Sequence, residues 1–127
     1  MHLPPAADAA RTLSDCPARA RRELQALLAR ERWPGDVDAA VLAVHEALTN
    51  AIEHGGGVRW VRAAVEGAVL EVEVCDAGSG FAVGGWRTPP DPMSERGRGL
   101  WLISRLADGY DVATTAEGTC LRLRFLP

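Results

Sequence analysis

The clearest pattern in the chain is an apolar stripe between residues 37 and 52, whose members recur at three- and four-residue steps. Such spacing predicts an amphipathic helix with one buried side. Glu46, Asn50 and His54 follow one another at four-residue steps and form a polar row beside that stripe rather than opposite it. The row is either a solvated helix edge or a half-sheltered ledge that serves a ligand. The apolar positions are Val37, Ala40, Val41, Val44, Ala47, Leu48, Ala51 and Ile52.

Two further helices are predicted, one before and one after this central helix. The first begins near Pro17, because proline is tolerated at the start of a helix, and runs to about Trp33. Its arginines and glutamates form either a solvated surface or a docking surface for an acidic partner. The second runs from about Gly99 to Ala107. The apolar side of the first helix consists of Ala20, Leu24, Leu27 and Leu28.

Alternating apolar and polar residues predict two strand pairs, each joined by a turn that contains glycine. One side of each pair is apolar, which favours an antiparallel sheet with one buried face. Residues 6–13 are either a helix start or a short edge strand. The sequence therefore predicts an α+β fold, a mostly antiparallel sheet packed on helices. The strands are expected at 58–65, 69–75, 110–115 and 120–126, with turns at Glu66-Gly67 and Glu117-Gly118.

Turn and loop signals separate these elements. Asp36 or Asp38 can cap the start of the central helix, and Gly55 can end it. Glycines and prolines make regular structure unfavourable from residue 78 to residue 97. A loop of this length in so small a domain is typically a lid, a binding loop or disordered, and we expect a lid at about residues 81–97.

The length and the charge of the chain restrict the functions that it can have. The 127 residues suit one domain, expected to span residues 1–127. A net charge of -3 argues against a nucleic-acid partner. All 14 basic residues are arginine, and the absence of lysine excludes Walker A loops, Schiff-base enzymes and eukaryotic-type protein kinases.

The three cysteines are odd in number and scattered, so neither a disulfide framework nor a CxxC metal site is expected. They are Cys16, Cys75 and Cys120, and a reducing cytoplasm suits them. No secretion signal and no long apolar run are recognised. We therefore expect a cytoplasmic protein without a membrane partner.

Three glycine-bearing spots follow the central helix, and the first is Asp76-Ala77-Gly78-Ser79-Gly80. A carboxylate accepts hydrogen bonds and so suits the amino group of adenine. Gly78 and Gly80 would let backbone approach a flat ring closely. The alternative is a plain turn that ends a strand, in which Asp76 satisfies backbone groups.

The second spot, Gly97-Arg98-Gly99-Leu100, closes the loop and opens a helix. Free N–H groups at a helix start suit phosphate oxygens, and Arg96 or Arg98 would add charge. The alternative is an ordinary loop-to-helix junction. At the third spot, Gly118-Thr119, the hydroxyl of Thr119 either reaches a phosphate or belongs to a hairpin turn.

The order of four segments resembles the GHKL superfamily of ATP-binding domains, whose N-box and three glycine boxes they match. The segments are HEALTNAIEHG, VCDAGSGF, SERGRGLWLISRLAD and EGTCLRLRF, within residues 45–125. Without a phosphoacceptor-histidine domain or a gyrase- or chaperone-like extension, the chain looks most like the stand-alone anti-sigma-factor serine kinases of bacteria. The resemblance implies a two-layer α/β sandwich that binds ATP and Mg²⁺ between the central helix and the lid.

Roles follow from the resemblance where the residues match. It implies that Asn50 binds Mg²⁺ through its side-chain oxygen and that Glu46 is the general base for a serine or threonine hydroxyl. Asp76 would read adenine, with Gly78 and Gly80 shaping its pocket.

The phosphates would be held by Gly97, Arg98 and Gly99, with Leu100 completing the motif, and Thr119 is a further candidate contact. His54 would line the rim. His45 faces the opposite side of the helix from His54, and neither is expected to accept a phosphoryl group. A second histidine for an HExxH zinc site is missing.

The implied substrate is an anti-anti-sigma antagonist of the STAS type, with a sigma factor or another regulator bound in its absence. The family resemblance also suggests a homodimer. Two alternatives remain: a partner-switching module that uses ATP only as a structural ligand, and the ATPase half of a histidine kinase that acts in trans. The second would need a separate histidine-bearing partner.

Overall fold

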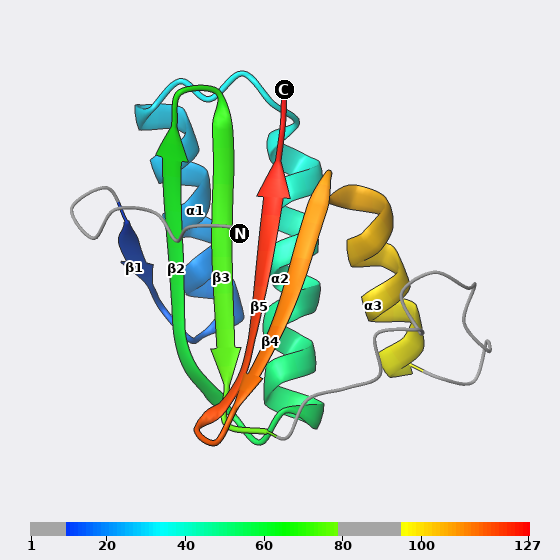
Figure 1. Ribbon diagram of the computed structural model, residues 1–127. Coiled ribbons are helices and arrows are strands. Elements are labelled where there is room, and N and C mark those ends of the chain that lie inside the picture. Colours follow the sequence, from blue (N-terminus) through cyan, green and yellow to red (C-terminus); the bar gives the residue numbers. More distant parts are fainter. Residues whose placement is uncertain (1–9, 79–94) are drawn as a thin grey trace.

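The computed structural model describes residues 10–78 and 95–127, apart from the side chains of residues 95–99. Within these residues, five strands form one antiparallel sheet in the order β1-β2-β3-β5-β4, and three helices cover one face of it (Figure 1). This two-layer α+β sandwich is the predicted fold class. The strands are β1 (Arg11–Leu13), β2 (Val58–Glu66), β3 (Val69–Asp76), β4 (Gly109–Thr115) and β5 (Gly118–Phe125). The helices are α1 (Pro17–Arg30), α2 (Val37–His54) and α3 (Glu95–Leu106).

The central helix α2 is capped by Asp36, whose Oδ1 accepts a hydrogen bond of 3.1 Å from the backbone N–H of Ala39. Its apolar stripe is buried as predicted, with two exceptions. Val37 is only partly buried, and Ile52 is 48% exposed. The prediction for Ile52 was wrong because the buried side of α2 ends at Ala51, and Ile52 lies in the last turn of the helix.

Helix α1 ends at Arg30 rather than near Trp33. Arg32 adopts a left-handed φ of 51°, which turns the chain out of the helix. Trp33 then packs into the core, and its Nε1–H donates a hydrogen bond of 2.8 Å to the Ala68 carbonyl oxygen. A Cβ at Gly35 would overlap the Trp33 ring, so this turn requires glycine. The predicted apolar side of α1 is buried: Ala20, Leu24, Leu27 and Leu28.

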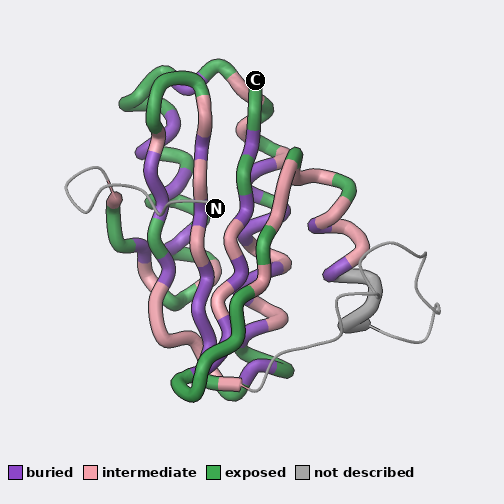
Figure 2. The backbone as a smooth tube through the Cα atoms, viewed as in Figure 1, coloured by how far each residue is buried: buried purple, intermediate pink, exposed green. Residues whose placement is uncertain are grey.

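Buried and less buried residues alternate along β3 and β5 (Figure 2), as the sequence pattern predicts. The β2–β3 hairpin turns at Gly67, where φ is 62°, and the β4–β5 hairpin turns at residues 116–117. The undecided segment 6–13 contains the edge strand β1, which pairs with β2. The residues that point from β3 and β5 into the core are Leu70, Val72, Val74, Leu121, Leu123 and Phe125.

Helix α3 begins at Glu95, four residues before the predicted start at Gly99, and ends at Leu106. The last three residues of the predicted lid, 95–97, therefore belong to this helix. Residues 81–94 of the lid lie outside the described residues. Leu100 and Ile103 are buried and anchor α3 to the core. In the described part of the chain, no helix is long and apolar enough to cross a membrane.

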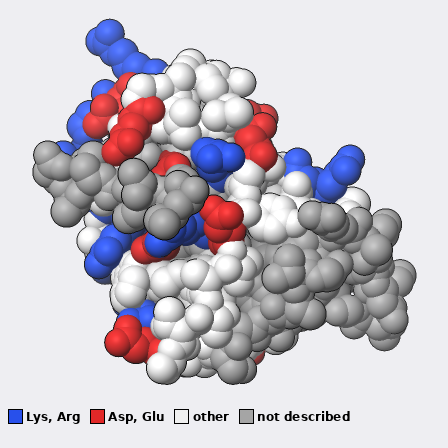
Figure 3. Space-filling view, in the orientation of Figure 1, with Lys and Arg blue, Asp and Glu red and all other residues white. Residues whose placement is uncertain are grey.

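The open face of the sheet carries interspersed positive and negative side chains (Figure 3). Both carboxylate oxygens of Glu73 accept hydrogen bonds of 2.8 Å, one from Trp60 Nε1 and one from Arg122 Nε. The guanidinium groups of Arg59 and Arg62 lie 4.4 and 4.8 Å from the centre of the Trp60 ring. Burial raises the pKa of Glu73, but the two hydrogen bonds and the charges of Arg122 and Arg62 outweigh it and lower the pKa.

Glu73→Gln is expected to reduce the free energy of unfolding at neutral pH by about 1 kcal/mol, because a charge-assisted hydrogen-bond network is lost. Since the pKa of Glu73 is lowered in the folded state, its contribution is present above the ordinary value of 4.5 and is lost as the pH falls through the folded-state pKa. Urea unfolding from neutral to acidic pH measures both effects. Exposed Glu66 is the control position for the same substitution. If the free energy of unfolding of E73Q changed with pH in parallel with that of the wild type, this role would be contradicted.

Cys75 and Cys120 form a disulfide, so the expectation of no disulfide was wrong. That expectation rested on the odd number and wide spacing of the cysteines. The two are 45 residues apart in sequence but lie directly opposite each other in the β3–β5 pair. Cys16 remains free and exposed.

Candidate functional site

The candidate site lies where β3, β5 and the last turn of α2 meet, at the lower end of the sheet in Figure 1. Asp76 is the last residue of β3 and is only 7% exposed. Its Oδ1 accepts a hydrogen bond of 2.8 Å from the backbone N–H of Gly78. A carboxylate offers about four acceptor positions, and this bond occupies one of them. Asp76 is therefore an oriented and nearly buried acceptor.

The start of β5 closes tightly over the end of β3. Thr119 pairs with Asp76 in the sheet and is 1% exposed. Its Oγ1 donates a hydrogen bond of 3.3 Å to the Gly78 carbonyl oxygen. Gly118 has a φ of 145°, and a Cβ there would overlap the Asp76 carbonyl oxygen. Thr119 thus contacts the turn after Asp76, and the hairpin turn proper lies at residues 116–117.

The end of α2 supports Asp76 from the other side. A Cβ at Gly55 would overlap the Asp76 carboxylate, so the helix can approach this closely only with glycine. The Gly57 carbonyl oxygen accepts a hydrogen bond of 3.1 Å from the Ala77 N–H. Sequence reasoning assigned Gly55 only a helix-ending role. The run of three glycines, 55–57, was the available signal for a close approach.

The polar row of α2 is graded in exposure. Glu46 and Asn50 are half-buried and His54 is exposed. Asn50 precedes Gly55 by five residues, which places it about 7–8 Å along the helix axis from the contact with Asp76. Glu46 lies one helical turn farther away. The row therefore leads away from Asp76 along α2.

The Asn50 side chain carries a buried Nδ2 with no hydrogen-bond partner among the described residues. An unpaired buried polar atom costs free energy, so such an atom calls for a partner. The oxygen and nitrogen of an amide are assigned from their surroundings, and a flip would place Oδ1 at the same position. Asn50 thus fits a role as an oxygen ligand of a hard cation.

The second glycine spot lies inside α3 rather than in front of it, since the helix begins at Glu95. Gly97 and Arg98 are still among the first four helical residues, whose N–H groups have no partner within the helix. Gly99 follows, and Leu100 is 4% exposed, so Leu100 packs in the core. Gly80 and the side chain of Arg98 lie outside the described residues.

A family model described as a histidine kinase-like ATPase domain matches residues 10–125. The chain belongs to this family. The GHKL resemblance is thereby confirmed, and with it a general ATP-binding, kinase-like function. No curated protein sequence matches this histidine kinase-like ATPase.

Two solved structures share the ATPase fold. The RsbU and RsbW domains of Rv1364c from Mycobacterium tuberculosis match with a TM-score of 0.63 and 21% identity, over 92% of this chain and 31% of that chain. The histidine kinase domain of the blue-light activated kinase EL346 from Erythrobacter litoralis matches with a TM-score of 0.56 and 21% identity, over 95% of this chain and 65% of that chain. This chain spans less than two thirds of either one, and at these identities the likeness concerns the fold.

On the prediction that Asp76 binds adenine, Gly55→Ala is expected to weaken ATP binding about tenfold and to lower the free energy of unfolding by about 1–3 kcal/mol, because the added methyl group displaces the Asp76 carboxylate. Calorimetric titration with ATP and chemical unfolding measure the two effects. G57A is the matched control: its Cβ would meet nothing within 4 Å, while its φ of 108° still strains alanine. Unchanged ATP affinity in a G55A protein of lowered stability would contradict a contact between the Asp76 carboxylate and ATP.

Proposed function

We propose that this ATPase domain binds ATP with the adenine amino group on Asp76 and the phosphates farther along α2. The observation that carries this proposal is the packing around Asp76: its carboxylate accepts a hydrogen bond from the Gly78 N–H and lies against Gly55, and its carbonyl group lies against Gly118. An oriented acceptor at the closed end of a site suits the N–H donor of adenine. Thr119 and Gly78 support this end through their hydrogen bond.

The phosphate end would lie between α2 and the first turn of α3. The free N–H groups of that turn, from Glu95 to Arg98, attract phosphate oxygens at the positive end of the helix dipole. Gly99 and Gly80 are further candidate contacts of the nucleotide, and Leu100 fixes the turn by packing in the core. His54 lies on the exposed rim.

Asn50 would hold Mg²⁺ through its amide oxygen, in agreement with its unpartnered buried amide. When bound, Mg²⁺ neutralises charge on the transferring phosphate. Glu46 lies one turn before Asn50 on the same side of α2, with about 5–6 Å between the Cβ atoms of such a pair. A carboxylate at this position can accept the proton of an attacking hydroxyl group.

We propose further that the acceptor is a serine or threonine of a STAS-type anti-anti-sigma protein. In this account the domain acts in the cytoplasm as an anti-sigma regulator, works as a homodimer and binds a sigma factor or another regulator when the antagonist is absent. The half-buried Glu46 beside Asn50 supports phosphoryl transfer, because a module that only binds ATP needs no base there. The shared fold with the structure that contains an RsbW domain supports the same class.

A histidine kinase ATPase that acts in trans is the second candidate, favoured by the shared fold with the EL346 kinase domain. Incubation with γ-labelled ATP, Mg²⁺ and either a STAS-type protein or a histidine phosphotransfer domain separates the two. The proposal expects label on the STAS-type protein that survives acid, as phosphoserine and phosphothreonine do. Label that is lost in acid and retained in base would identify phosphohistidine and the second candidate. Tight ATP binding without transfer to either protein would leave a partner-switching module.

A further inference from the structure

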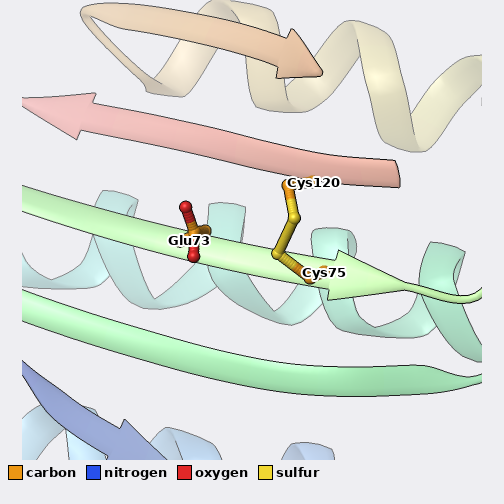
Figure 4. A group of neighbouring side chains, drawn as sticks. All are labelled: Glu73, Cys75 and Cys120. Atoms are coloured by element: carbon orange, nitrogen blue, oxygen red, sulfur yellow. A yellow bond between two sulfur atoms is a disulfide. The ribbon is translucent and has the colours of Figure 1, made fainter. Parts of the chain in front are cut away.

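The disulfide joins the two strands that form the closed end of the ATP site. Cys75 of β3 faces Cys120 of β5 with 4.0 Å between their Cα atoms (Figure 4). The next pair in the register is Asp76 and Thr119. One covalent link therefore lies directly beside the residues proposed to hold adenine.

The contacts around Asp76 depend on the spacing of these strands. Gly118 allows β5 to pass against the Asp76 carbonyl group, and the Thr119 hydroxyl group reaches the Gly78 carbonyl oxygen over 3.3 Å. Both contacts span β3 and β5 at the strand ends, where fraying concentrates in the absence of a constraint. A disulfide one residue inward holds the two ends in register.

The two cysteines differ in their exposure to solvent. Cys75 is fully buried and pairs with Trp60 of β2, whereas Cys120 is half-buried. A thiolate from solution therefore attacks Cys120 Sγ. The S–S bond breaks, Cys75 leaves as a thiolate and takes up a proton, and the reductant is joined to Cys120 as a mixed disulfide. A second reductant thiol attacks the reductant's sulfur in that mixed disulfide, which releases Cys120 as a thiol and the oxidised reductant as a disulfide.

The charge of Glu73 affects the thiol–disulfide equilibrium of Cys75 and Cys120. One of its oxygens and the two sulfur atoms all lie within 4.8 Å of one another. The three do not form a metal site in this state, because the sulfurs are bonded to each other and both Glu73 oxygens accept hydrogen bonds. The lowered pKa of Glu73 keeps a negative charge beside the sulfurs, which disfavours thiolates and so favours the disulfide.

We propose that Cys75 and Cys120 form a thiol–disulfide switch that sets the nucleotide affinity of this domain. The oxidised form holds Asp76 and Thr119 in place and binds ATP tightly, and reduction by a small thiol or a dithiol protein loosens the strand ends and weakens binding. In a reducing cytoplasm, a disulfide is typically transient or redox-sensing, which suits a switch rather than a permanent staple. This inference rests on the proposed adenine site at Asp76.

Calorimetric titration of ATP into the oxidised and the dithiothreitol-reduced protein tests the switch, with the thiol state verified by alkylation and mass spectrometry. Reduction is expected to weaken ATP binding about tenfold, within the usual range of coupling between sites. By reciprocity, saturating ATP should make the disulfide harder to reduce by the same factor. C75S/C120S and C75V/C120V should both show the affinity of the reduced form under all redox conditions. C16S, which removes the exposed free cysteine, should behave as wild type.

Equal ATP affinity in the verified oxidised and reduced proteins would overturn the switch and leave the ATP site intact. If neither form binds ATP, the switch and the proposed site both fail. If both forms bind ATP but D76N leaves the affinity unchanged, the adenine assignment fails, and with it the reason for placing the switch beside Asp76. The comparison of ATP affinity between the oxidised and the reduced wild-type protein tests the switch even if a double variant does not fold.

Discussion

Glu46→Gln is expected to slow phosphoryl transfer to the protein substrate by about 1,000-fold, because a positioned general base contributes typically 10²–10⁴-fold to the rate. Glutamine keeps the size and one oxygen of the side chain but cannot accept the proton of the attacking hydroxyl group. Glu46 is assigned to the hydroxyl group and not to the nucleotide, so ATP affinity should change little. Single-turnover transfer of labelled phosphate and calorimetric ATP titration measure the two quantities separately.

The control for this substitution is Glu53→Gln, on the same helix. The Glu53 side chain is 56% exposed and has no proposed contact with the nucleotide or the hydroxyl group, so its loss should leave transfer unchanged. A wild-type transfer rate in E46Q would remove Glu46 from the mechanism. A parallel loss of ATP affinity and transfer would instead place Glu46 among the ligands of the nucleotide or its metal.

Asp76→Asn is expected to weaken ATP binding about 100-fold, equivalent to about 2.7 kcal/mol. The variant loses a charge-assisted hydrogen bond to adenine, and its amide must pair with both the Gly78 N–H and the nucleotide. If the amide nitrogen turns towards the nucleotide, it meets the adenine amino group donor to donor. Because the side chains are nearly the same size, the fold should persist.

Exposed Asp111 on β4 is the matched control, and D111N should bind ATP as wild type does. Inosine triphosphate offers a second comparison, since an oxygen acceptor replaces the amino group of adenine. The wild type should discriminate against it, and D76N should lose most of that discrimination. Retention of full ATP preference in D76N would place the adenine elsewhere.

The fold was predictable because its periodic patterns are strong. The stripe of α2 and the alternation of β3 and β5 each follow from burying one side of an element. The wrong predictions concern residues whose positions depend on tertiary contacts. Trp33 leaves α1 to bond the Ala68 carbonyl group, a partner 35 residues away that no local pattern reveals. Ile52 fits the spacing but lies just beyond the buried side.

The sequence supplied the candidate residues of the site but not the packing around them. Asp76 and Asn50 were identified from their residue types and from a family resemblance, and the structure places them along one helix and the strand end beside it. The closeness of Gly55 to the Asp76 carboxylate and the disulfide depend on register between elements distant in sequence. Register is set by long-range pairing, so neither a glycine run nor an odd cysteine count predicted these contacts.

The central claim is that Asp76 anchors ATP in this histidine kinase-like ATPase. Its most direct test is chemical unfolding of the oxidised wild type and D76N with Mg²⁺ and ATP at 100 times the wild-type dissociation constant. ATP should raise the free energy of unfolding of the wild type by about 2.7 kcal/mol and that of D76N by a few tenths of a kcal/mol. An equal gain in the two proteins, or no gain in the wild type, would contradict the account.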